Sequence, residues 1–219
     1  MERRQFSTAA VTTLGALAAL PLPGMAQARK FREGTDFIAL DKPVAVEAPA
    51  GKIELIEFFW YSCPHCNAFE PKLQEWIKNL PKDVAFRRVP IAFRDDFAPQ
   101  QRLFYVLEAM GKVEEVHAKV FAAIHVQKML LNTQDSIADW VAKQGIDRAK
   151  FLEIYNSFAV ATKTRKAVQL QDGYKIDGVP SLGIAGRYYT DGTMAGTMER
   201  ALQVVEFLFT EARAKAARG

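Results

Sequence analysis

The two cysteines of this 219-residue chain stand three positions apart, in the run Cys63, Pro64, His65 and Cys66. The run follows the apolar stretch 53–60, which is typical of a central strand covered on both faces. A disulfide removes more entropy from the unfolded chain as the loop it closes grows longer, so a bridge across four residues stabilises little. Two thiols placed after such a strand therefore indicate a disulfide that is made and broken.

The first 28 residues have the order of a secretory signal. Arg3 and Arg4 give a basic start, residues 9–20 are apolar or small, and Ala26 and Ala28 fit a small-x-small cleavage site. The apolar part is shorter than the ~20 residues of a membrane-spanning helix. The arginine pair also fits part of a twin-arginine signal, so both export routes stay open. We predict a protein of the periplasm, where disulfides persist.

Composition indicates a globular protein without a nucleic-acid partner. Hydrophobic residues make up 49% of the chain and charged residues 25%, and the formal net charge is only +4. The lysines and arginines are scattered and form no run of the kind that binds nucleic acid. We expect a monomer.

The remaining chain divides into a strand–helix–strand part, a helical part and a strand–strand–helix part. The expected strands are 53–60, 84–89, 181–185 and 187–190, and the flanking helices are 66–80 and 198–209. Only helical patterns occur between about residues 98 and 173. This order predicts one sheet of α/β type, interrupted by a helical insertion.

The position of the two thiols predicts different chemistry for each. Cys63 falls at the start of the helix, where free N–H groups and the helix dipole favour a negative charge, so it should be exposed and acidic. Cys66 shares a helix face with Phe69 and Leu73, and should be buried. A substrate thiolate would attack Cys63 and Cys66 would leave, after which Cys63 leaves as its thiolate when the substrate disulfide closes.

His65 lies between the thiols, where its ring can stabilise the Cys63 thiolate. Two thiols and one histidine within four residues leave a tetrahedral zinc site one ligand short, so we expect no metal. Haem attachment would need a histidine at position 67, which is Asn67. His117 and His125 fall in the helical part and are predicted to be ordinary helix residues.

Four motifs in order resemble the DsbA family of periplasmic disulfide oxidases. They are Glu57-Phe58-Phe59, Cys63-Pro64-His65-Cys66, Phe69-Glu70 and Gly178-Val179-Pro180-Ser181. The resemblance implies a thioredoxin fold with an inserted all-helical domain. The thioredoxin-like domain would comprise residues 29–95 and 174–219, and the insertion residues 96–173. The family activity is donation of the disulfide to newly exported, unfolded proteins without a bound cofactor, with reoxidation by a DsbB-like, quinone-linked membrane protein.

The resemblance also implies roles for residues outside the thiol motif. Pro180 would be cis and lie beside the disulfide, with the Val179 backbone free to pair with an extended substrate. Independently of the resemblance, we expect Tyr61, alone among the aromatic residues before the motif, to lie at the surface, where it could contact the apolar segments of unfolded substrates.

The acidic pair of the family matches Glu57 and Glu70, which could relay the proton that Cys66 gains or loses. Arg88 stands where the family has a lysine, and an arginine cannot release its proton as a lysine can. A buried Glu57–Arg88 ion pair with no part in turnover is therefore an equally open interpretation.

Three other functions remain open on the sequence. A disulfide isomerase or reductant could use the same motif, although isomerases of this fold usually carry a dimerisation domain. A copper-binding module could use Cys63, Cys66 and His65 as ligands. A chaperone with an unused disulfide would keep its activity without either cysteine.

Overall fold

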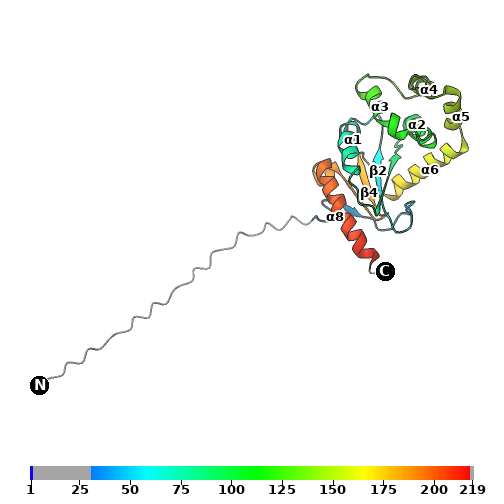
Figure 1. Cartoon of the computed structure of the whole chain (residues 1–219). Coiled ribbons are helices and arrows are strands. Elements are labelled where there is room, and N and C mark those ends of the chain that lie inside the picture. The colour runs from blue at the N-terminus through cyan, green and yellow to red at the C-terminus, as the bar shows by residue number, and fades with distance from the viewer. Residues whose placement is uncertain (2–30, 218–219) are drawn as a thin grey trace. The chain divides into compact units, whose positions relative to one another are not determined.

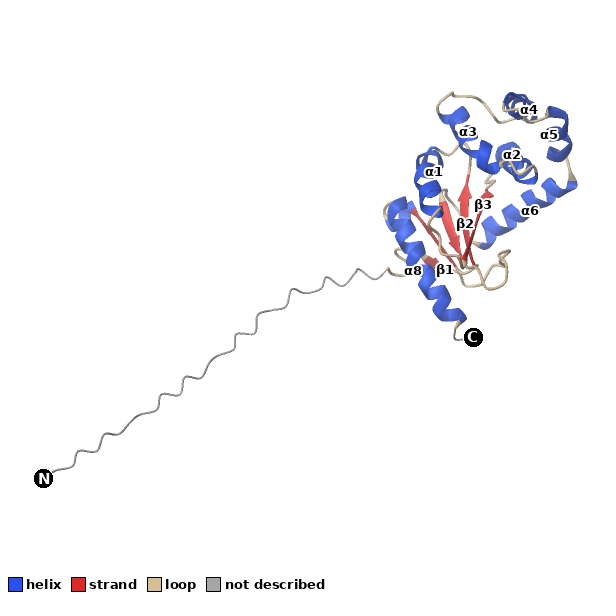
Figure 2. Ribbon diagram, viewed as in Figure 1, coloured by secondary structure: helices blue, strands red, loops and turns tan. Residues whose placement is uncertain are grey.

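A five-stranded mixed sheet lies at the centre of the protein (Figure 2). The computed structural model describes Met1 and residues 31–217, so the predicted signal segment lies outside the described residues except for Met1. The strand order is β1-β5-β4-β2-β3. The strands are β1 Ile38–Ala39, β2 Ile53–Phe59, β3 Val84–Pro90, β4 Ser181–Ile184 and β5 Tyr188–Asp191.

Strand β2 occupies the interior of the sheet, as its apolar sequence predicts. It pairs in parallel with β3 and antiparallel with β4, and six of its seven residues are buried. Its register places Glu57 opposite Arg88 on β3 and opposite Leu182 on β4. The hairpin between β4 and β5 turns at Ala185 and Gly186, both with positive φ, which suits a short turn between twisted strands.

As predicted, a run of helices lies in the chain between the first three strands and the last two. The helices are α1 Pro64–Ile77, α2 Ala98–Ala109, α3 Val113–His125, α4 Gln134–Lys143, α5 Arg148–Tyr155, α6 Phe158–Gly173, α7 Gly192–Ala195 and α8 Met198–Ala216, with a short 3-10 turn at Asp95–Phe97. Helices α2 to α6 follow β3 and precede β4, so the insertion is all-helical. The domain boundaries at residues 95/96 and 173/174 stay a prediction. None of the helices in the described part of the chain could cross a membrane.

Apolar side chains fill the two sides of the sheet separately. Helices α1 and α8 lie beside the strands on one side, and α6 lies on the other (Figure 1). On one side, Leu55 of β2 packs in a cluster with Phe69 and Leu73 of α1 and with residues of α8. The other cluster contains Ile56 and Phe58 and extends into the helical insertion. Since alternate residues of a strand face opposite sides, β2 contributes side chains to both clusters. Helix α1 packs against the sheet through Phe69 and Leu73.

Candidate active site

Helix α1 begins at the thiol motif, with Cys63 as its N-cap. Cys63 has an extended conformation (φ −78°, ψ 118°), and its Sγ accepts a hydrogen bond from the Cys66 backbone N–H at 3.4 Å. Pro64 stands at the first helical position, where the missing N–H costs no helical bond. The proline and the sulfur cap therefore fix where the helix starts and place both thiols in its first turn.

The surroundings of Cys63 favour its thiolate. Interaction with the Cys66 side chain is the largest cause that lowers the pKa of Cys63, which falls to about 6. Partial burial opposes this effect, while the backbone N–H groups of Cys66 and His65 and the charge of His65 add to it. Cys63 is only 7% exposed, less than the sequence led us to expect, because its Sγ also lies against the Val179 carbonyl oxygen at 3.4 Å.

Cys66 differs from Cys63 in both burial and acidity. Its side chain is fully buried. Burial raises the pKa of Cys66 well above its ordinary value, and the side chain of Cys63 and the charge of Glu57 raise it further. Both cysteines are free thiols in this structure, so it represents the reduced form.

The loop before β4 closes over Cys63. The Val179–Pro180 peptide bond is cis, as the resemblance implies, and the Val179 carbonyl faces the sulfur. A groove of about 410 Å³ opens beside this loop. Its lining residues are His65, Gly178, Val179, Pro180, Asp191, Gly192, Thr193, Gly196 and Met198.

The predicted acidic and basic residues meet in one buried cluster. Arg88 donates from Nε to Glu57 Oε2 at 2.9 Å and from Nη2 to Glu70 Oε1 at 3.1 Å. All three residues are 6% exposed or less. Burial raises the pKa of Glu57 to about 8 despite the charge of Arg88. Burial also acts against ionisation of Glu70, yet interactions with His117 and Arg88 hold the pKa of Glu70 below its ordinary value.

The expectation that Tyr61 lies at the surface is wrong. Tyr61 is 1% exposed, because its ring packs edge-on against Phe59 and against Phe121 of α3. Its hydroxyl lies 2.9 Å from His117 Nδ1, and burial raises the pKa of Tyr61 well above its ordinary value. A direct contact of this side chain with substrates is therefore withdrawn.

His117 is the site residue that the sequence interpretation missed. It is 2% exposed, and its Nε2 lies 3.5 Å from Glu70 Oε2, so it joins the buried cluster from α3. Its spacing from Val120 and Phe121 places it on the apolar face of α3, and this pattern could have identified it. Among the described residues, no group of three or more histidine, cysteine, aspartate and glutamate side chains is arranged to hold a metal ion.

Comparisons with known proteins identify the family of this chain. The DSBA-like thioredoxin domain family matches residues 54–203. A thiol:disulfide interchange protein DsbA of Burkholderia cepacia is 43% identical over 88% of this chain and 92% of its own length. A protein with the same name from Pseudomonas aeruginosa is 42% identical over 91% of this chain and 95% of its own length.

Solved structures show the same fold. The crystal structure of Pseudomonas aeruginosa DsbA is 41% identical, covers 85% of this chain and 97% of its own, and superposes with a TM-score of 0.81. The oxidoreductase DsbA of Xylella fastidiosa superposes with a TM-score of 0.77 at 29% identity, over 84% of this chain and 98% of its own. The predicted thioredoxin fold with a helical insertion is thus confirmed. The chain belongs to the DSBA-like thioredoxin domain family and is a protein disulfide oxidoreductase.

Proposed function

We propose that this protein is a thiol:disulfide interchange protein of the periplasm, which donates its Cys63–Cys66 disulfide to newly exported proteins. The observation that carries the proposal is the opposite direction of the two pKa shifts, with Cys63 lowered to about 6 and Cys66 raised. An acidic thiol is a good leaving group, so the disulfide passes readily to a substrate. The names of the relatives from Burkholderia cepacia and Pseudomonas aeruginosa support the same activity.

The reaction needs two substrate thiols and no other reagent. A substrate thiolate attacks Cys63 Sγ, the bond between the two protein sulfurs breaks, and Cys66 takes up the electron pair and then a proton. The second substrate thiolate attacks the substrate sulfur of the mixed disulfide, and Cys63 leaves as a thiolate. The protein ends as a dithiol and the substrate as a disulfide. His65 and the first-turn N–H groups support the Cys63 thiolate.

The substrate backbone would lie along the loop before β4. The Val179 carbonyl faces the attacked sulfur, and Pro180 supplies no N–H that could compete at that atom. The adjoining groove has room for substrate side chains. Unfolded exported proteins are the substrates that such an open, shallow site would accept. We expect a monomer that is reoxidised by a DsbB-like, quinone-linked membrane protein.

The redox equilibrium with glutathione tests this proposal. A disulfide donor should reach equal amounts of both forms at a potential less negative than about −180 mV, the value of protein disulfide isomerase. A potential near that of thioredoxin, about −270 mV, would identify a reductant instead. Tight Cu(I) binding without oxidation of a dithiol peptide would favour the copper module, and activity that survives loss of both cysteines would favour the chaperone.

Cysteine variants test the division of labour between the thiols. Cys63→Ser should abolish peptide oxidation and form no covalent substrate complex. Cys66→Ser should accumulate mixed disulfides at Cys63, because the resolving thiol is missing. Oxidation of a dithiol peptide measures the activity, and non-reducing gels of periplasmic extracts show the mixed disulfides. Mixed disulfides formed at Cys66 in the Cys63→Ser variant would reverse the assignment.

A further inference from the structure

A second cavity lies next to the thiol motif, on the side of the helical insertion. Its volume is about 470 Å³, within the range of sites that bind small ligands. Residues from three places in the chain line it. They are Trp60 and Ser62 before the motif, Gln100 of α2, and residues 128–132 of the loop between α3 and α4. We call this cavity the insertion pocket.

A buried glutamine ties the insertion pocket to the thiol motif. Gln100 is 4% exposed, and its Nε2 donates to Ser62 Oγ at 2.7 Å and to the Leu131 carbonyl oxygen at 3.0 Å. Ser62 directly precedes Cys63, whose sulfur lies against the Val179 carbonyl oxygen at 3.4 Å. A substrate joined to this sulfur therefore starts next to both the insertion pocket and the groove.

A histidine holds the other end of the same loop. His125 is the last residue of α3, and its Nε2 lies 2.8 Å from the Tyr61 carbonyl oxygen. Because a carbonyl oxygen can only accept, this nitrogen carries a hydrogen and donates it. The loop between α3 and α4 is thus fixed at both ends to the backbone just before the reacting cysteine.

The outer wall of the insertion pocket is apolar and open to solvent. Leu130, which lines it, is 78% exposed, and Met129 beside it is half-buried. Val126 of the same loop is 74% exposed. Single exposed apolar residues are common on protein surfaces, but apolar residues gathered at a cavity are typical of a binding site.

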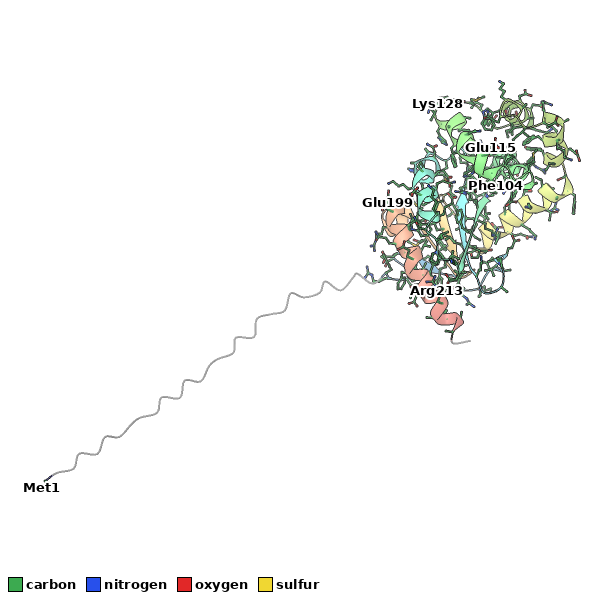
Figure 3. All side chains as sticks on the ribbon, in the orientation of Figure 1. Met1, Phe104, Glu115, Lys128, Glu199 and Arg213 are labelled. Carbon is green, nitrogen blue, oxygen red and sulfur yellow. The ribbon has the colours of Figure 1, made fainter. Side chains whose placement is uncertain are left out.

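Lys128 adds a positive charge to the pocket. It lies on the loop that follows α3, at the edge of the protein (Figure 3). Its φ of 57° is a left-handed conformation that favours glycine and is costly for lysine, and such positions cluster at functional sites. Asp96, the acidic residue of the lining, is held by Arg94 through hydrogen bonds of 3.0 and 2.9 Å. Lys128 forms no ion pair with any described residue, so its charge is available to a ligand.

We propose that the insertion pocket is a second substrate subsite, which takes an apolar side chain near the reacting cysteine of an exported protein and prefers an acidic residue beside it. This inference rests on the proposed function, in which the substrate is joined to Cys63. The groove beside Val179 receives the substrate on one flank of that cysteine, and the insertion pocket receives the other flank. Burial of the apolar side chain favours binding, and Lys128 attracts the neighbouring carboxylate.

Oxidation of matched dithiol peptides tests this preference. The peptides carry leucine–glutamate, serine–glutamate or leucine–lysine at the two positions before the cysteine pair, or at the two positions after it. Second-order rate constants with the oxidised protein are divided by the thiolate fraction of each peptide. On one flank only, leucine–glutamate should react about tenfold faster than serine–glutamate, as partial burial of a leucine side chain implies, and about threefold faster than leucine–lysine. Equal rate constants on both flanks would overturn the inference.

Variants of the pocket locate the preference on the protein. Leu130→Ser should reduce the ratio of the leucine to the serine peptide to about twofold or less, since less apolar surface is buried. Phe158→Ser is the matched control and should keep the ratio, because Phe158 is 80% exposed but stands at the start of α6. Lys128→Gly should remove the preference for glutamate over lysine, and glycine suits a φ of 57°. An unchanged ratio in Leu130→Ser, with urea unfolding showing a folded protein, would overturn the role of this pocket.

A covalent complex shows directly where the substrate lies. A single-cysteine form of the leucine–glutamate peptide is activated as its mixed disulfide with thionitrobenzoate. The Cys63 thiolate of the Cys66→Ser variant attacks the peptide sulfur and releases thionitrobenzoate, which leaves the peptide joined to Cys63. Nuclear Overhauser contacts should join the peptide leucine to the methyl groups of Leu130 or Ile124, which both line the pocket. Contacts only with Val179 and other groove residues would overturn the inference.

The outcomes separate this inference from the proposed function. Oxidation of all peptides at one rate would overturn the second subsite and leave the disulfide donor intact. Absence of oxidation would overturn the proposed function, and the covalent complex, which needs only the Cys63 thiolate, would still decide where the peptide leucine lies. Unchanged peptide ratios in Leu130→Ser, together with slower reoxidation by quinone-containing membranes, would assign the pocket to the membrane partner instead.

Discussion

Two cysteines in a single helical turn have pKa values displaced in opposite directions. Cys63 has a pKa of about 6, whereas that of Cys66 is raised by burial. At pH 7 we therefore predict that iodoacetamide modifies Cys63 of the reduced protein at least ~100-fold faster than Cys66, since only the thiolate reacts. Peptide mass spectrometry after short labelling measures both rates. Comparable modification of the two residues would contradict the assigned environments.

His65 provides a second prediction at the scale of the residue. His65→Ala removes the ring charge and keeps the backbone N–H, so the pKa of Cys63 should rise. The equilibrium with glutathione should then shift towards the oxidised enzyme by about tenfold for each unit of that rise. Thiolate absorbance gives the pKa and the glutathione titration gives the equilibrium. A changed pKa of Cys63 without a changed glutathione equilibrium would show that the acidity of Cys63 does not determine how readily the disulfide is donated.

Sequence patterns identified the reacting thiols and the cis proline better than the buried residues that pack around them. Cys63, Cys66 and Pro180 stand in short motifs whose chemistry can be argued from position alone. Tyr61 was misplaced because its burial depends on the packing of α3, about 60 positions along the chain. His117 meets Glu70 only through the same long-range packing, and a single polar residue on an apolar helix face does not reveal its partner.

Strands β2 and β3 carry two ion pairs with different burial. In the first pair, the side chains of Arg88 and Glu57 are both 4% exposed or less. In the second pair, Arg87 binds Glu54, and the Arg87 side chain is 25% exposed. Arg88→Met leaves two buried carboxyl groups without their cation and should lower the free energy of unfolding by about 3–5 kcal/mol at pH 7. Arg87→Met should cost roughly half as much or less, because water reaches its site.

Urea unfolding of the two variants at pH 7 and pH 5 measures this difference. The cost of Arg88→Met should be smaller at pH 5 than at pH 7. Arg88 helps to hold the pKa of Glu70 below its ordinary value, and without that cation the buried Glu70 carboxyl group must take up a proton, which costs less at the lower pH. Equal costs for both variants at both pH values would show that the buried cluster contributes no more than the exposed pair.

Local signals were sufficient for the longer elements and not for the shortest ones. The apolar run gave β2, and the side chains of Thr133 and Asp147 cap the starts of α4 and α5 within the part where only helices were expected. The two-residue strand β1 and the four-residue helix α7 were not predicted. Strand β1 exists only through its pairing with β5, and so few residues cannot display a periodic pattern.

The stability of the whole molecule should depend on pH differently in its two redox forms. The pKa of Cys63 is lowered from about 8.5 in the unfolded chain to about 6. A depressed pKa stabilises the folded reduced form fully above the unfolded value, and this effect is lost as pH falls through the folded value. From pH 6 to 8.5, the reduced form should gain about 1.4 kcal/mol per pH unit relative to the oxidised form.

Paired urea unfolding curves at pH 5, 7 and 8 measure this gain. Glu57 titrates in both redox forms, so its contribution largely cancels in the difference between them. The reduced Cys63→Ser variant lacks the acidic thiol and should show no such gain in stability with pH. Above pH 8.5 the raised pKa of Cys66 acts in the opposite direction, so the range ends there. A difference that is constant from pH 5 to 8 would exclude a stabilised Cys63 thiolate.

The sulfur cap of α1 has a consequence for how this protein could lose its chemistry. Oxygen atoms of side chains cap several other described helices in the same way, from Thr133, Asp147, Ser157, Asp191 and Thr197. Serine is also a good cap, so exchanging one sulfur for oxygen at Cys63 keeps α1 and the groove beside Val179 in place. The Cys63→Ser variant should therefore be a folded protein that keeps the groove and has no redox activity.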